Sequence, residues 1–591
     1  MIRPPPEHTT PVSTSAAPLA AWVGVVLLLV SAPFERLQPL FRLPGQQLSN
    51  IEAVLLLVLA AWVLALVAGS AAPVARVRLL LHSPLAAPLA ALVAVMFATA
   101  VAAPGLLRAN ALGMAARYGL ALLVYLLTVD ALTRGRLERV LAVSVALGGV
   151  LAALVLLDFW GWPAVRAWLL QFRTGISLVG SQVRATGPFQ YPTIASMYLE
   201  VLFALSLGCL LLMLDRHSNR AAGAVVAVLL LVGQAVVLTF TRAGLLTLFV
   251  SLVLVALLRL RERGVDRGAL ILGGIALAIG LQFVASRSFD ALKLRLSTEG
   301  QSEWYRAAFD APLEMQLPAG GIVAVPLSVT NTGRVTWAPG ASPRIRLSYH
   351  WLLEGSEAAQ GEALVVSWEG LRTDFPWAVG PGETGHIVAR VEAPAAPGTY
   401  SLLWDIEEEH RLWFSTEPDA SLFTTRATVV GHGATLNPDA LRPFPKSGAR
   451  PGRLVLWRAA GRMLADRPLT GVGPDNFRLL YGGYAGLANA DQRVHSNNLY
   501  LEVLVSGGLA AAFVLGWIGW RLLVASWQAV VPRVVHPAAP GVVAALAALA
   551  VHGLFDAFLA FTATYILTAI TMGLVAGLSL PAAARVSAEG A

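Results

Sequence analysis

The chain is poor in cysteine, in lysine and in charge of either sign. Among its 591 residues there is one cysteine, and 13% of the residues are Asp, Glu, Lys or Arg. Soluble proteins carry about 25% charged residues, and the mean hydropathy here is +0.66. These values exclude a soluble enzyme and a disordered chain, and the single Cys209 excludes an intrachain disulfide or a cysteine-cluster metal site. The sequence is that of an integral membrane protein.

The net charge of +8 does not indicate nucleic acid binding. Lys293 and Lys446 are the only lysines, so nearly all of the positive charge is arginine, and much of it flanks apolar segments. Arginine beside membrane spans holds cytoplasmic loops on their side of the bilayer. We therefore expect a lipid bilayer as the main surroundings and no nucleic acid partner.

Apolar runs fill residues 1–285 and return near the end of the chain. A helix that crosses a bilayer core needs about 20 apolar residues. By that criterion we predict a mainly α-helical, polytopic membrane protein with about 12 spans, about nine of them in an N-terminal membrane domain at 1–285 and the rest at 499–591. The predicted spans are 17–33, 51–69, 84–103, 112–130, 138–158, 194–214, 222–240, 243–260, 268–285, 499–526, 541–561 and 563–582.

The arginines predict which ends of these spans face the cytoplasm. Loops after even-numbered spans are rich in arginine, for example at Arg216 and Arg261, whereas the short loops after odd-numbered spans hold few. Cytoplasmic loops carry the excess of Lys and Arg. Both chain ends are thus predicted to lie on the cytoplasmic side, and segments 159–193, 240–243 and 286–498 share the outer face.

The first span has a second interpretation. Arg3, the apolar stretch after it and Val30-Ser31-Ala32 fit a signal peptide with a cleavage site. We favour an uncleaved first helix, because the other spans make a cleaved signal unnecessary.

Residues 286–498 are a different kind of sequence. Charged residues become more frequent, and apolar residues alternate with polar ones over 323–329 and 345–351. A period of two between turn signals is typical of half-buried antiparallel strands. We therefore expect an all-β sandwich at 310–431, inserted in the outer loop, and a helical and loop region at 450–498.

The sandwich has a resemblance of its own. The run Val329-Thr330-Asn331-Thr332-Gly333, followed by Trp337 and Tyr349-His350-Trp351, resembles immunoglobulin-like modules appended to bacterial surface-glycan proteins. The lack of a cysteine pair excludes an antibody-type domain. Such a sandwich would bind a glycan or a protein partner, or would act as a spacer or lid, and both roles stay open.

After the sandwich the sequence predicts a helix at 453–467. One face of that helix, which suits packing on the membrane domain, holds Leu454, Trp457, Ala460, Gly461 and Leu464.

Four motifs with a shared outer location point to a known family. Arg184-Ala185-Thr186-Gly187-Pro188-Phe189 precedes one predicted span, and Thr241-Arg242-Ala243-Gly244 joins two others. Gly471-Val472-Gly473-Pro474-Asp475-Asn476-Phe477 is followed by His495-Ser496-Asn497-Asn498-Leu499-Tyr500-Leu501-Glu502. In this order they resemble the O-antigen ligase/polymerase superfamily of bacterial envelope glycosyltransferases.

The resemblance implies a GT-C-like membrane fold in the bacterial cytoplasmic (inner) membrane and a role in polysaccharide or lipopolysaccharide biosynthesis. It implies a metal-independent glycosyltransferase whose donor is an undecaprenyl-diphosphate-linked glycan. The acceptor would be a hydroxyl of lipid A–core, of another glycan or of a protein. The sandwich at 310–431 departs from simpler family members, whose outer loop is mainly helical, and this leaves the acceptor open.

The residues themselves also support diphosphate binding by Arg184 and Arg242. A diphosphate that leaves an anomeric carbon carries negative charge that must be stabilised, and the outer loops contain no Asp-x-Asp motif for a divalent cation. Arginine is always charged and pairs bidentately with phosphate. Arginine at full membrane depth costs roughly 2.5–3.5 kcal/mol, which favours a functional role for Arg242 between two apolar helices. The alternative is an anchor that reaches lipid headgroups.

His495 is the predicted catalytic base. An unperturbed imidazole has a pKa of about 6.5 and can accept the proton of an acceptor hydroxyl near neutral pH. The hydroxyl would then attack the anomeric carbon opposite the diphosphate and invert it. Two alternatives stay open: His495 binds phosphate as a cation, or it only enters the next helix, which Ser496 and Asn497 can cap.

Four residues beside His495 are predicted to support the site. Tyr500 and Glu502 begin the next helix and would orient the substrate or His495. Asn497 and Asn498 would hydrogen-bond sugar.

Three ionisable residues in predicted spans are also candidates for the site. Glu200 lies near the outer end of its span and is expected to pair with Arg184 or Arg242. His552 and Asp556 are four residues apart, which places them on one helix face. Ionisable groups in membrane helices are usually paired, so we favour a structural pair there over a catalytic one.

We favour O-antigen ligase-type transfer over two related activities, those of an O-antigen or exopolysaccharide polymerase and of a protein O-oligosaccharyltransferase. A lipid-linked glycan flippase is the alternative of another class, but the sequence lacks the internal repeats and midplane contacts of transporters. A glycan sensor or adhesin would leave Arg184, Arg242 and His495 unexplained. No cofactor is expected.

Overall fold

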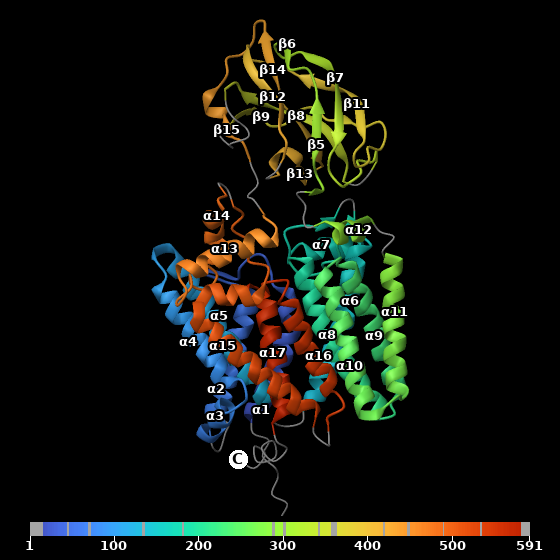
Figure 1. The fold of residues 1–591 in the computed structure, drawn as a ribbon, viewed down its shortest axis with the longest axis vertical. Helices are drawn as coiled ribbons and strands as arrows, with labels where there is room; N and C mark the ends of the chain where they lie inside the picture. The colour runs from blue at the N-terminus through green and yellow to red at the C-terminus, as the bar shows by residue number, and fades with distance from the viewer. Residues whose placement is uncertain are drawn as a thin grey trace, which may run out of the picture.

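The computed structural model of the chain consists of a helical bundle and a β-rich domain (Figure 1). Arg3, Lys446 and the chain ends lie outside the described residues. The structure describes residues 16–43, 46–68, 73–132, 136–179, 182–286, 290–298, 303–340, 343–355, 363–409, 411–417, 420–445, 450–487, 490–531 and 535–580.

Every predicted span coincides with a helix of the bundle. Among the described residues, nine helices are long and apolar enough to cross a membrane, and the bent pair α3–α4 would make ten. Two further apolar helices, α1 and α16, are shorter. The chain is thus a multi-pass membrane protein, while the total of about 12 spans stays a prediction. The bundle comprises α1 (Ala16–Ser31), α2 (Asn50–Ala68), α3 (Pro73–Leu81), α4 (Ala86–Ala102), α5 (Gly105–Leu132), α6 (Leu137–Phe159), α7 (Pro163–Leu169), α8 (Pro192–Asp215), α9 (Asn219–Leu238), α10 (Arg242–Arg263), α11 (Arg267–Ser286), α15 (Leu499–Val530), α16 (Ala539–His552) and α17 (Thr562–Ser579).

Helix α8 lies inside the bundle. Of its most apolar stretch 89% is buried, against 22% for α11, so α8 is covered by other helices while α11 lies at the edge of the bundle. Glycines allow the closest approach between α8 and α16. A Cβ on Gly208 would lie 2.7 Å from the carbonyl oxygen of Ala538, and one on Gly541 would lie 2.2 Å from the nitrogen of Gly208. Small residues of this kind are typical of helix packing in membranes.

The predicted span 541–561 is interrupted. Helix α16 ends at His552, and a turn and a short 3-10 helix, η6 (Phe558–Ala560), precede α17. The backbone of Leu499 donates to the carbonyl of Gly553 at 2.7 Å, and Arg117 donates to the carbonyl of Ala560 at 3.0 Å. Irregular backbone at membrane depth is tolerated where protein buries it and satisfies its hydrogen bonds.

The β-rich domain, hereafter the β domain, contains two sheets that share one hydrophobic core. The larger sheet has the order β15-β9-β8-β12-β14-β6, with β10 beside β8 and β13 beside β12, and the smaller has the order β11-β7-β5. All pairs are antiparallel except β14–β6. Its strands are β5 (Ala307–Asp310), β6 (Glu314–Pro318), β7 (Ile322–Asn331), β8 (Ile345–Leu353), β9 (Leu364–Ser367), β10 (Thr373–Asp374), β11 (Thr384–Glu392), β12 (Gly398–Glu408), β13 (Leu412–Trp413), β14 (Phe423–Val430) and β15 (Arg442–Pro443).

The predicted alternation of side chains is confirmed in β7. Val325, Leu327 and Val329 are buried while the residues between them face outward or are half-buried. Trp337 and Trp404 are fully buried in the same core. A β-rich region at 310–431 is therefore confirmed, with strands from 307 to 443; its immunoglobulin-like character stays a prediction.

Two helices connect the β domain to the bundle. They are α12 (Asp290–Ser297) before it and α13 (Arg453–Asp466) after it. In Figure 1 both lie with α7 and α14 (Phe477–Ala485) at the end of the bundle that faces the β domain, which we call the β-domain end. Four short strands, β1 (Phe41–Leu43), β2 (Gln46–Leu48), β3 (Leu178–Val179) and β4 (Gln182–Val183), form two hairpins in loops of the bundle.

The helix predicted at 453–467 is present, and its predicted packing face is right in part: Ala460 is buried and Leu464 packs beside it. Leu454 is 61% exposed, and Trp457 is also exposed. The buried face consists of Leu456, Ala459, Ala460 and Met463, because its two alanines let α13 approach the loops beneath it closely.

Candidate active site

The two motif arginines lie beside each other at the β-domain end. Arg184 donates from Nε to the carbonyl of Thr239 at 2.9 Å and from Nη2 to the hydroxyl of Thr241 at 3.2 Å. Thr239 and Thr241 close the turn between α9 and α10, and α10 begins at Arg242. The structure therefore brings Arg184 and Arg242 together, as their proposed shared role requires.

A buried ion pair anchors the loop of Arg184. Arg173 donates both terminal nitrogens to Asp158 at 2.6 Å each, and the backbone of Gly187 donates to the same carboxylate at 3.2 Å. Gly187 has φ +59°, and a Cβ there would lie 2.7 Å from the side chain of Val155. Glycine in this motif thus permits both the backbone conformation and the contact with α6.

Glu200 does not pair with either motif arginine, contrary to expectation. Its carboxylate accepts hydrogen bonds from Ser196 at 2.6 Å and from Nδ1 of His552 at 3.0 Å, and both Glu200 and His552 are buried. Gly244 of the Thr-Arg-Ala-Gly motif faces this pair: a Cβ there would lie 2.0 Å from the Ser196 hydroxyl. The network therefore joins α8, α10 and α16 directly beneath Arg242.

Asp556 does not form the predicted helical pair with His552. Helix α16 ends at His552, so Asp556 lies in the following turn, where its Oδ1 accepts from the backbone of Ala557 at 2.7 Å. The i, i+4 rule applies only where the helix continues, and this helix does not. His552 finds its acid partner on α8 instead.

Two arginines without a motif join Arg184 and Arg242. Arg295 of α12 interacts electrostatically with Arg184, Arg242 and Arg453, the first residue of α13. Burial, reinforced by the charges of Arg242 and Arg453, lowers the pKa of Arg295 to about 10. Burial and the charge of Arg295 likewise lower the pKa of Arg184. We call these four residues the arginine cluster.

The charges of the arginine cluster suit the binding of an anion. Across the described residues, no carboxylate forms a salt bridge with Arg184, Arg242 or Arg295. The Nε of Arg295 is buried without a hydrogen-bond partner. Buried like charges disfavour their own ionised forms, and an anion placed among them removes that penalty. Sequence reasoning missed Arg295 and Arg453 because each lies in a helix with no motif around it.

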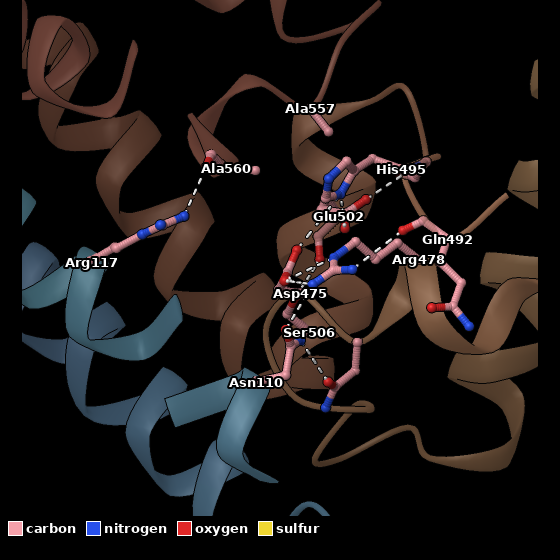
Figure 2. Close-up of polar contacts among 12 residues, drawn as sticks. Asn110, Arg117, Asp475, Arg478, Gln492, His495, Glu502, Ser506, Ala557 and Ala560 are labelled. Carbon is pink, nitrogen blue, oxygen red and sulfur yellow. Dashed lines mark hydrogen bonds and ion pairs between the residues drawn. The ribbon is translucent and has the colours of Figure 1, made fainter. Parts of the chain in front are cut away.

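His495 lies in a second cluster, built on residues from distant parts of the chain (Figure 2). Its Nδ1 is 3.2 Å from Oε1 of Glu502 and 4.0 Å from Oδ1 of Asp475. Glu502 also accepts from the backbone of Ser496 at 2.9 Å, which fixes the carboxylate. A small cavity adjoins the imidazole and is lined by both acids and by apolar residues. Its lining is Met114, Tyr118, Asp475, His495, Leu499, Glu502, Ser506, Ala557, Leu559 and Ala560.

The acids set the proton affinity of His495. Burial alone favours the neutral imidazole, but the hydrogen bond and charge of Glu502, with the charge of Asp475, outweigh it. The pKa of His495 is therefore raised above its ordinary value. A hydrogen bond from Nδ1–H to Glu502 would leave Nε2 as the nitrogen that can accept a proton.

The Gly-Val-Gly-Pro-Asp-Asn loop positions Asp475 by docking on a kink in α15. Gly508 has φ 62° and ψ −151°, which breaks the helix there. The backbone of Val472 donates to the carbonyl of Val505 at 2.9 Å, and that of Gly473 donates to Ser506 at 3.0 Å. These bonds use carbonyls next to the break in the helix, and so tie the loop to the helix that carries Glu502.

Asp475 is held by Arg478, which Asn110 holds in turn. Arg478 donates from Nε and Nη2 to Asp475 at 2.9 and 2.8 Å, and also to Asn110 of α5 at 2.7 Å. Asn110 donates to Asn476 at 3.1 Å. Figure 2 shows Asp475 and Arg478 between Asn110 and His495. The cluster thereby links the loop of Asp475 to α5.

Two of the remaining predicted residues, Asn498 and Tyr500, bond backbone groups rather than the imidazole of His495. Asn498 caps α15, accepting from the backbone of Leu501 at 2.9 Å, and donates to Leu554 at 3.2 Å. Tyr500 donates to the carbonyl of Ala550 at 2.7 Å. Asn497 has φ +52°, an uncommon backbone conformation for a residue other than glycine. Of the four supporting residues near His495, Glu502 is the one that bonds the imidazole.

The arginine cluster and the His495 cluster lie at the same end of the bundle, separated by residues 553–557. Arg453 donates to the carbonyl of Phe555 at 3.0 Å and lies over its ring. Ala557 lines the cavity beside His495. The described residues show no direct contact between His495 and the arginines, and no group of three acidic, histidine or cysteine side chains able to hold a metal ion.

One comparison with known proteins identifies a family. Residues 419–516 match a family model described as O-antigen ligase. The match spans α13, α14, the loop of Asp475 and His495, and ends within α15. No curated protein matches the chain. The segment that carries His495, Asp475 and Glu502 is therefore similar to the O-antigen ligase family, which supports the resemblance of this membrane protein to the O-antigen ligase superfamily.

Proposed function

We propose that the chain transfers a glycan from an undecaprenyl-diphosphate carrier to an acceptor hydroxyl at the outer face of the bacterial inner membrane. The observation that carries the proposal is that one end of a membrane bundle holds two kinds of group. Arg184, Arg242 and Arg295 form no salt bridge with a carboxylate among the described residues, and His495 at the same end is bonded to a carboxylate. Glycosyl transfer from a lipid diphosphate needs positive charge to stabilise the leaving diphosphate and a base to take the proton of the attacking hydroxyl. The O-antigen ligase match at 419–516 supports this class of reaction.

The arginines would stabilise the leaving group. When the bond between the anomeric carbon and the diphosphate oxygen breaks, its electron pair stays with the diphosphate. Arg242 is at the start of α10, and Arg184 bonds Thr241 just before it. A diphosphate at the membrane surface would reach both arginines there. Guanidinium groups form bidentate hydrogen bonds to phosphate, and pre-placed charge stabilises the transition state without reorganisation. No metal ion is required in this scheme.

His495 would activate the acceptor. Nε2 takes the hydroxyl proton as the acceptor oxygen forms its bond to the anomeric carbon, from the side opposite the diphosphate. Glu502 holds the ring through Nδ1 and stabilises the imidazolium that forms. A single displacement of this kind inverts the anomeric centre. The diphosphate or solvent receives the proton afterwards.

The acceptor distinguishes three activities of this class. Transfer to lipid A–core makes a ligase, transfer to another glycan repeat a polymerase, and transfer to a protein hydroxyl an O-oligosaccharyltransferase. We favour the ligase, because the matched segment contains the His495 loop.

The test is incubation of the purified chain with a lipid-diphosphate glycan and each acceptor class, with mass analysis of the products. We expect transfer to continue with excess chelator and His495→Ala to lose about 10²–10⁴-fold. His386→Ala is the matched control, since His386 lies on the exposed face of the β domain and should leave transfer unchanged. Activity that needs a divalent cation, or full activity in the His495 variant, would exclude the mechanism.

A further inference from the structure

The arginine cluster draws on both connections between the bundle and the β domain. Arg184 lies in the loop before α8, and Arg242 is the first residue of α10. Arg295 comes from α12, which leads into the β domain, and Arg453 from α13, which leads out of it. The family motifs cover only the first two of these residues.

Arg295 is held against the loop of Arg184. Helix α12 packs against β3, and β3 pairs with β4, the strand that ends one residue before Arg184. Ala291 and Leu292 are buried and hold α12 against the bundle, while Lys293 on the same helix is exposed. Arg295 is half-buried, and its Nε has no partner. A buried guanidinium nitrogen without a partner is costly, and an incoming acceptor oxygen would remove that cost.

Arg453 is positioned by the turn between the two clusters. Its Nη2 donates to the carbonyl of Phe555 at 3.0 Å, and its guanidinium lies 5.8 Å from the centre of the Phe555 ring. These contacts hold the side chain in place. The same residue interacts electrostatically with Arg295 and with His552, so it faces the arginine cluster.

We propose that Arg295 and Arg453 bind the diphosphate of the lipid-linked donor together with Arg184 and Arg242. The inference rests on the proposed function in taking a lipid diphosphate as the anion. The donor diphosphate is esterified at both ends and carries two negative charges, and further charge develops on the oxygen that leaves the anomeric carbon. Two arginines neutralise the bound donor, and two more supply charge and N–H donors for the leaving diphosphate. Because Arg295 and Arg453 stand on opposite connections, donor binding also ties the β domain to the bundle on both sides.

The test is equilibrium binding of radiolabelled undecaprenyl diphosphate and undecaprenyl monophosphate to the purified full chain. We expect Arg295→Gln and Arg453→Gln each to weaken diphosphate binding about tenfold or more. Binding of the monophosphate should fall less, because it has one phosphate to satisfy. Lys293→Gln and Arg458→Gln remove a cation from the same two helices at exposed positions and should change neither affinity.

Arg453→Lys is a second variant that keeps the test informative where Arg453→Gln does not fold. It keeps the charge but loses the planar donor pair, so its diphosphate affinity should lie between those of the wild type and Arg453→Gln. Unchanged diphosphate affinity in both Gln variants, or equal losses for diphosphate and monophosphate, would overturn the inference. Failure of the proposed function is seen separately, as a wild-type chain that binds the diphosphate lipid but transfers no glycan.

Discussion

Two carboxylates, those of Glu502 and Asp475, set the proton affinity of His495. Glu502 is fixed by the Ser496 backbone and Asp475 by Arg478, so neither acid can turn away from the imidazole. His495 was identifiable from its motif, and so was Glu502. Asp475, the second acid beside His495, belongs to another motif, and the distance between these two residues follows only from the fold.

At the residue scale we predict the pH dependence of Glu502→Gln. Transfer requires neutral His495, so kcat/KM should rise as the pH increases through the pKa of His495. Glu502 raises that pKa; without its charge the rise should move to lower pH, while the plateau falls because the ring is held less firmly. The measurement is a pH–rate profile. Glu354→Gln, at an exposed ion pair in the β domain, is the control and should leave the profile in place. An unshifted rise in Glu502→Gln would show that His495 is not the titrating base.

A second prediction at this scale concerns the ion pair beneath Arg184. Asp158→Ala leaves Arg173 buried and unpaired, which costs about 3–5 kcal/mol of unfolding free energy. The exposed pair Arg216–Glu138 offers the control, since Glu138→Gln should change stability by about 0.5 kcal/mol or less. Thermal unfolding in detergent, followed by tryptophan fluorescence, compares the two. Equal shifts in both variants would contradict the assigned role of Asp158.

At the scale of elements, the site depends on breaks in helices. The kink at Gly508 presents carbonyls to the loop of Asp475, and the end of α16 at His552 frees residues 553–557 to lie between the two clusters. Hydropathy located both helices but not their breaks, because apolar composition continues through 541–561. The packing face of α13 was predicted only in part, because apolar residues lie on more than one side of this helix and the partner surface selects which of them are buried.

We predict that Gly508→Ala uncouples the loop from the helix. The φ of 62° strains any residue with a Cβ, and that Cβ would lie 2.5 Å from the carbonyl oxygen of Pro468. Asp475 would then lose its position beside His495, and transfer should fall about tenfold or more, with normal membrane insertion. Gly516→Ala is the matched control, because the same helix leaves that position open. The measurement is kcat/KM in both variants. Wild-type activity in Gly508→Ala would refute the idea that the kink at Gly508 holds the loop of Asp475 in place.

At the scale of the whole molecule, the two clusters and the β domain occupy one end of the bundle (Figure 1). Because the donor is proposed to be presented outside the cytoplasm, this end should face outward. The arginine-rich turns at the other end, such as the one with Arg263, should face the cytoplasm.

Labelling with a membrane-impermeant maleimide tests that orientation. Cys209 is the single cysteine and is buried, so background labelling should be low. We expect Glu314→Cys, exposed in the β domain, to be labelled in intact spheroplasts. Arg263→Cys, exposed at the opposite end, should react only after permeabilisation. The reverse pattern would place the arginine cluster and His495 on the cytoplasmic side and exclude the proposed reaction.

The sequence by itself determined the membrane class, the positions of the helices, the β-rich insert and the motif residues Arg184, Arg242 and His495, because hydropathy, side-chain period and motif spacing are local properties. Only the tertiary structure added Arg295 and Arg453 to the cluster, joined Glu200 to His552 rather than to an arginine, and set Asp475 beside His495. These partners are separated by tens to hundreds of residues, and their proximity depends on which helices pack together and where each helix breaks.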